Sequence, residues 1–99
     1  MQENDDEFFD RADDHINLSN AQITEKIGRG KVSASMMYAT ARFNAWLSAC
    51  RWHTGEELAE AKDETIEYFV SEYRKMLNEN FDDYIKGFEK YMRSPDDDT

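Results

Sequence analysis

The chain has 99 residues and a formal net charge of −10, with 22 acidic residues against 12 basic ones. This charge argues against binding to nucleic acid or to an anionic membrane surface, because both need clusters of Lys and Arg. The length fits one domain. The single cysteine, Cys50, excludes a disulfide within the chain and favours a reducing, cytoplasmic location.

Few residues that break helices are present, namely four Gly and one Pro. Residues that favour helices, such as Ala, Glu, Lys, Met and Leu, are frequent, and β-branched residues are scarce. The N-terminal residues have neither the positive nor the apolar region of a signal peptide, and no apolar run is long enough to span a bilayer. We therefore expect an all-α protein with no signal peptide and no membrane span.

The first helix is expected to begin after Asn4, a suitable N-cap, with acidic residues in its first turn. Apolar residues at helical spacing continue to Ile27. Polar residues around Ser19 leave open whether this helix is continuous or breaks there. Gly28 is expected to end it as a C-cap glycine.

The central stretch from Lys26 to Gly55 has five basic residues and no acidic one. After a basic loop at residues 28–31, a second helix is expected from Val32. Its apolar residues recur in alternating steps of four and three, which is typical of a helix-packing seam: Val32, Met36, Ala39, Phe43, Trp46 and Cys50. Because alanines form a second apolar face, we expect this helix to be buried between two acidic helices.

Thr54 and Glu57 match a capping box and predict a third helix from Gly55 to Asn78. Asn80 is expected to cap a shorter fourth helix.

The expected fold is an elongated antiparallel bundle of three to four helices. Residues 1–93 would make one helical domain, and residues 94–99 an acidic disordered tail. Long helices in a short chain leave apolar surface uncovered, so a homodimer is expected.

Arg42 is the only charged residue between Val32 and Cys50. A buried guanidinium needs a partner, so we expect an ion pair with a carboxylate of the first or third helix. The alternative is a pocket for an anion or small molecule lined by Tyr38, Asn44 and Trp46.

The basic segment before the second helix offers another candidate site. Helix N-termini bind anions through free backbone N–H groups, and the side chains of Arg29, Lys31 and Ser33 would add to this. The segment does not match a P-loop. A simple helix start is the competing interpretation.

Cys50 and His53 are three residues apart and could share a metal ion or act as nucleophile and base. Ligands for a closed zinc site are too few, since the chain has only one Cys and two His. A buried cysteine beside a histidine at a helix end is the favoured interpretation, and no metal or other cofactor is expected.

Five runs of the sequence look familiar together: residues 6–13, 15–18, 30–39, 41–46 and 83–85. They resemble a family of small bacterial proteins known as domain of unknown function 3144. The resemblance covers nearly the whole chain. It implies a bacterial, cytoplasmic protein. The family has no assigned activity, so no site residues are carried over.

The leading hypothesis for function is a non-catalytic cytoplasmic protein that acts by protein–protein contact, first with itself and possibly with another protein. The alternative is an anion or small-molecule binder, possibly an enzyme, with a site around Arg42 or the segment from Gly28 to Ser33.

Overall fold

The computed structural model describes residues 5–93, which form four α-helices and no strand. The chain divides into two compact units, which meet in the sequence between Arg51 and Trp52. The prediction of a single domain over residues 1–93 stays a prediction. The expected cap at Asn4 and the expected tail at residues 94–99 lie outside the described residues.

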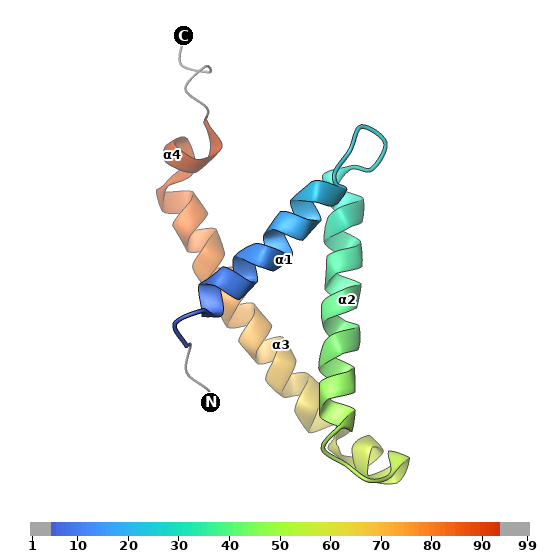
Figure 1. The fold of residues 1–99 in the computed structure, drawn as a ribbon. Coiled ribbons are helices and arrows are strands. Elements are labelled where there is room, and N and C mark those ends of the chain that lie inside the picture. The colour runs from blue at the N-terminus through green and yellow to red at the C-terminus, as the bar shows by residue number, and fades with distance from the viewer. Residues whose placement is uncertain (1–4, 94–99) are drawn as a thin grey trace. The chain divides into compact units, whose positions relative to one another are not determined.

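The first unit contains α1 (Phe8–Gln22) and α2 (Arg29–Ala49), joined by a short loop from which the two helices diverge (Figure 1). Asp5 organises the start of α1. Its carboxylate accepts a hydrogen bond from the Glu7 backbone N–H at 2.9 Å and its carbonyl accepts one from Phe8 at 3.1 Å. Arg11 then donates to both carboxylate oxygens of Asp5, at 2.9 and 3.2 Å.

The loop between the two helices differs from the sequence prediction. Helix α1 is continuous through Ser19 but ends at Gln22, before the predicted Ile27. The reason is a turn at Thr24, whose hydroxyl accepts hydrogen bonds from the backbone N–H groups of Lys26 and Ile27.

Gly28 does not end α1. It is the N-cap of α2, with φ −79° and ψ 168°, an extended conformation rather than the left-handed one of a C-cap glycine. Arg29 and Lys31 therefore lie in the first turn of α2. The sequence prediction had placed them in a loop.

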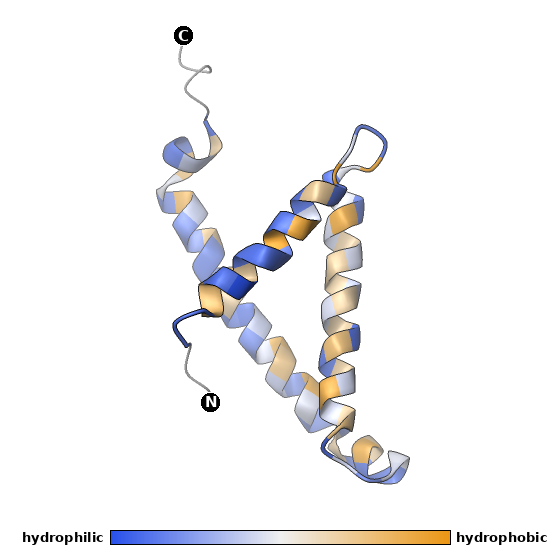
Figure 2. Cartoon of the chain, viewed as in Figure 1, coloured by the Kyte–Doolittle hydropathy of each residue, from blue (hydrophilic) through white to orange (hydrophobic). Residues whose placement is uncertain are grey.

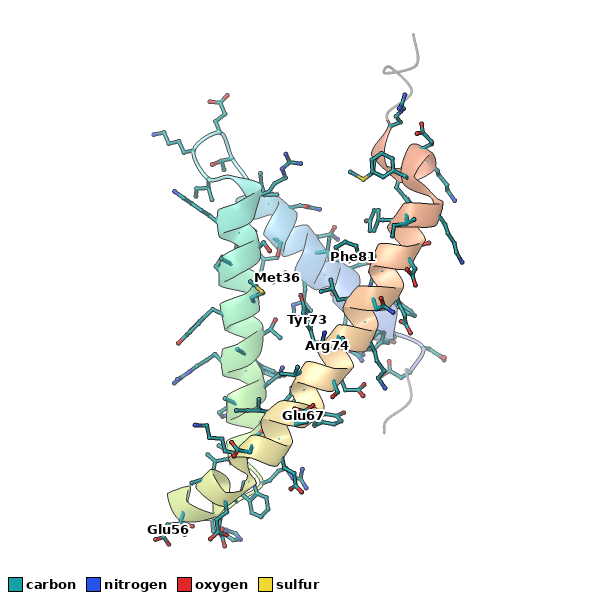
Figure 3. The ribbon with its side chains drawn as sticks, turned by 180° about the vertical axis from the view of Figure 1, so that it is seen from behind. Met36, Glu56, Glu67, Tyr73, Arg74 and Phe81 are labelled. Carbon is teal, nitrogen blue, oxygen red and sulfur yellow. The ribbon has the colours of Figure 1, made fainter. Side chains whose placement is uncertain are left out.

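Contact between α1 and α2 is concentrated near the loop. Val32 of α2 is buried, with 4% of its surface exposed. The hydroxyl of Ser19 donates to the Met36 sulfur at 3.3 Å, and Figure 3 shows Met36 on the side of α2 that faces α1. The two helices are thus held together at their connected ends.

The second unit contains α3 (Gly55–Lys86) and α4 (Phe88–Met92). The predicted capping box is confirmed. The Thr54 hydroxyl accepts from the Glu57 backbone N–H at 3.1 Å, and the Glu57 carboxylate accepts from the Thr54 N–H at 3.3 Å. The His53 N–H donates to the same carboxylate at 2.8 Å.

Asn80 does not cap a new helix, and α3 runs through it. Its side-chain amide donates to the Met76 carbonyl at 2.8 Å, inside the helix. The interruption comes at Gly87 instead. A Cβ there would lie 2.8 Å from a ring atom of Tyr91, so a larger residue at position 87 would make this ring shift. Tyr91 also donates to Asp83 at 3.4 Å and packs on Tyr84, with ring centroids 5.1 Å apart.

The first unit leaves most of α2 exposed. Phe43 is 61% exposed and Trp46 is 58% exposed, and their rings contact each other with centroids 5.4 Å apart. Figure 2 shows apolar and weakly polar residues along most of α2. Within the first unit, α1 covers only the part of α2 near the connecting loop, so this unit by itself does not provide the predicted burial of α2.

Candidate functional site

The four residues proposed to surround an anion on α2 do not converge. Tyr38, Arg42 and Trp46 are spaced by four residues, so they follow one another along a single face of the helix. Asn44 is two residues from Arg42 and faces elsewhere. It is half-buried, and its carbonyl accepts a hydrogen bond from the Ser48 hydroxyl at 2.9 Å. The predicted pocket is thus reduced to one exposed row.

Arg42 is exposed, and it has no ion pair among the residues that the structure describes. The expected ion pair with a carboxylate of α1 is absent from the described residues of the first unit, and the expected ion pair with a carboxylate of α3 stays a prediction. An exposed guanidinium stays hydrated, so it does not need a carboxylate partner.

Arg29, Lys31 and Ser33 are all exposed at the start of α2. The positive charges of Arg29 and Lys31 stand next to the positive end of the helix dipole, where negative charge would be favourable. The first turn contains no acidic residue that could supply it. Anion binding by these residues stays a prediction.

Cys50 is the C-cap of α2 and is exposed, so its predicted burial in a helix seam is wrong for the single chain. His53 lies in the linker before α3. Among residues 5–93, no group of three or more His, Cys, Asp or Glu side chains is arranged to hold a metal ion.

Sequence reasoning missed a hollow on the surface of α3. It is open to solvent, has a volume of about 370 Å³, and is lined by residues of this one helix: Val70, Tyr73, Arg74, Leu77, Asn78 and Phe81. Tyr73, Arg74 and Phe81 are labelled in Figure 3. The predicted break at Asn80 had assigned Phe81 to a separate helix. The spacing of apolar residues, continued across Asn80, would have shown the shared face.

Exposed apolar surface is the dominant feature of the described residues. Val32 is the only buried apolar residue among them, while 24 large apolar side chains are exposed. No helix in the described part of the chain is both long enough and apolar enough to cross a membrane. Monomeric soluble proteins rarely leave large continuous apolar patches in water.

These features define the class: a small all-helical protein whose described residues leave most of their large apolar side chains exposed. The chain belongs to the DUF3144 family of proteins of unknown function, whose profile matches residues 8–85. It is similar to the protein NB7890A from Shewanella sp, known from an NMR structure. The two are 40% identical with a TM-score of 0.72, and the match covers 91% of this chain and 95% of that one. No curated protein matches the chain.

Proposed function

We propose that the protein is a non-catalytic interaction protein of the bacterial cytoplasm whose fold is completed by self-association into a helical dimer. The observation that carries this proposal is the imbalance between one buried apolar side chain and 24 exposed large ones. The bacterial assignment is supported by the source of the similar protein, Shewanella sp. The single cysteine supports the cytoplasmic one.

The physical argument concerns stability. Ordering the backbone costs roughly 1–2 kcal/mol per residue, and apolar burial at about 25 cal/mol per Å² is the main term that offsets this cost. With Val32 as the only buried apolar residue in residues 5–93, one chain offsets little of it. A second copy would cover the exposed rows of α2 and α3, and in many homodimers no folded monomer is stable.

The charge distribution supports the same proposal. Helix α2 carries Arg29, Lys31 and Arg42 and no acidic residue, whereas α3 has an excess of acidic residues over basic ones. Packing α2 against acidic helices in an antiparallel dimer would bring opposite charges together. Arg42 would then have a carboxylate nearby.

The alternative is an anion-binding protein, for which the exposed basic residues at the start of α2 are the supporting observation. It has weaker support because Asn44 faces away from Arg42 and the hollow on α3 is far along the sequence from both candidate sites. Titration with inorganic phosphate, followed by amide NMR shifts at Arg29 and Lys31, tests it. Saturable shifts would favour anion binding.

The test of the leading proposal is thermal unfolding at two protein concentrations, followed by far-ultraviolet circular dichroism. If a dimer is the stable folded form, dilution by a factor of about one hundred lowers the Tm by several degrees. A Tm that does not depend on concentration would contradict the proposal.

A further inference from the structure

Helix α3 has an exposed apolar row with coiled-coil spacing. Ile66, Val70, Tyr73, Leu77 and Tyr84 are all exposed by between 41 and 50%, and they fit alternating steps of four and three residues. Asn80 occupies the one missing position. This row is separate from the half-buried residues of the same helix, such as Leu58 and Phe69, which lie on a neighbouring face.

The row has a polar member at each end of its apolar centre. Extending the same steps toward the N-terminus gives Asp63 and then Ala59. In a parallel pair, each residue of such a row faces its own counterpart, so Asp63 would face Asp63 and two carboxylates would be buried together. A parallel pairing of two copies of α3 is therefore unfavourable.

An antiparallel pairing removes this conflict. When one copy is reversed so that Val70 faces Tyr73 of the other, Ile66 faces Leu77 in the next layer, and Asp63 then faces Asn80. The Asn80 amide has two hydrogens. One already bonds the Met76 carbonyl, which leaves the other for the Asp63 carboxylate.

The outermost layer of this register is also complementary, because Ala59 faces Tyr84 and a small residue is matched to a large one. The two-fold axis lies between Ser71 and Glu72, close to the middle of α3, so the helices overlap over most of their length. Every contact is made twice, as a two-fold interface requires.

Charged residues beside the row agree with the same register. Glu67 and Arg74 occupy equivalent flanking positions one heptad apart, and the antiparallel pair sets Glu67 of one copy beside Arg74 of the other. On the opposite flank, Lys62 is brought beside Asp83. The Glu67 carboxylate accepts a hydrogen bond from the Ser71 hydroxyl at 3.4 Å, but neither Glu67 nor Arg74 has an ion pair among the described residues.

The charges also disfavour the neighbouring registers. A shift by one heptad in one direction would bring Glu67 beside Glu67 of the other copy, and in the other direction Arg74 beside Arg74. Like charges in such positions are destabilising and select the register.

The hollow on α3 can receive a side chain of the second copy. Val70, Tyr73, Arg74 and Leu77 are spaced as the four residues of a hole that receives one side chain in knobs-into-holes packing, and all four line the hollow. In the antiparallel register, Val70 of the second copy is the side chain opposite this hole.

We propose that α3 pairs with α3 of a second copy in this antiparallel register, with reciprocal Glu67–Arg74 ion pairs on its flank. This inference rests on the proposed self-association and specifies the surface and partner that produce it.

The test uses two charge reversals in the full-length chain, Glu67→Arg and Arg74→Glu. Each variant alone sets like charges against each other at both symmetric positions, so its dimer dissociation constant is expected to rise roughly tenfold to a hundredfold. Mixing the two variants in equal amounts gives a heterodimer in which both pairs are again opposite in sign. Light scattering should then show wild-type dimer affinity, and circular dichroism should show wild-type helix content.

Glu64→Arg is the matched control, since Glu64 carries the same charge but lies on the far side of the helix from the row. It should associate as the wild type does. Single variants that dimerise as well as the wild type, or a mixture that does not recover affinity, would overturn the antiparallel register while leaving self-association intact. A wild-type chain that stays monomeric would overturn the proposed function as well.

Discussion

Thr54 starts α3 through a reciprocal pair of hydrogen bonds with Glu57, at 3.1 and 3.3 Å. The pair satisfies two backbone N–H groups that have no partner inside the helix. The sequence predicted this feature because all of its atoms belong to residues within one turn. Nothing distant in the chain is needed to complete it.

Replacing Thr54 by Ala is expected to lower the free energy of unfolding by about 1 kcal/mol, because the Glu57 N–H loses its acceptor. Urea unfolding at one fixed protein concentration measures this loss. Thr40→Ala, at an exposed position within α2, is the matched control and should change stability little. Equal effects of the two substitutions would contradict the capping role.

Asp5 is the second residue whose role the structure defines. The hydrogen bonds from Arg11, and then the one from the Glu7 backbone N–H, lower the pKa of the Asp5 carboxyl below its usual value of 3.8. Because the folded-state pKa is lowered, the stabilisation is present above pH 3.8 and is lost as the pH falls through the folded-state pKa.

Arg11→Gln is expected to raise the pKa of Asp5 toward 3.8, since the largest cause of its lowering is removed. An NMR titration of the side-chain carboxyl carbon measures this directly. Arg29→Gln removes the same charge elsewhere in the first unit and should leave the Asp5 titration unchanged. An Asp5 pKa that Arg11→Gln does not move would show that the ion pair does not form in solution.

At the scale of the helices, the sequence identified each long element but not all of its ends. The end of a helix depends on which side chain forms a hydrogen bond with a free backbone group. One residue type can form such a bond at a helix end or inside a helix. Asn80 is a good N-cap by type, yet its amide bonds back to Met76 and α3 continues. Gly28 is a good C-cap by type, yet Thr24 forms the turn that precedes it and Gly28 begins α2.

The candidate sites were less predictable than the helices for a related reason. Periodicity shows which side of a helix is apolar but not what covers it, so Arg42, Phe43 and Cys50 were expected to be buried and are exposed in the single chain. The two-residue spacing of Arg42 and Asn44 was enough to predict that they face different sides of the helix.

Val32 is the buried residue in the first turn of α2, and its substitution tests how much this side chain stabilises the first unit. Val32→Ala removes the only buried apolar side chain of residues 5–93 and is expected to cost about 2 kcal/mol of unfolding free energy. Met37→Ala, on the same helix but 57% exposed, should cost much less if the described contacts decide stability. Chemical denaturation of both variants at equal concentration makes the comparison. A larger loss of unfolding free energy for Met37→Ala than for Val32→Ala would show that the described contacts around Val32 are not the main ones that stabilise α2.

At the scale of the whole molecule, the two units each leave most of their apolar side chains in water. Membership of the DUF3144 family and similarity to NB7890A establish relatives with this helical fold, but not what the helices contact. The proposed self-association would cover the exposed rows without any further component, and the net charge of −10 would favour contacts in which opposite charges are matched.

Sedimentation equilibrium of the wild-type protein at micromolar concentration tests this most directly. The chain has a mass of 11.7 kDa, and the account predicts a species of twice that mass which dissociates only on dilution. A single folded species of 11.7 kDa across the whole concentration range would contradict it.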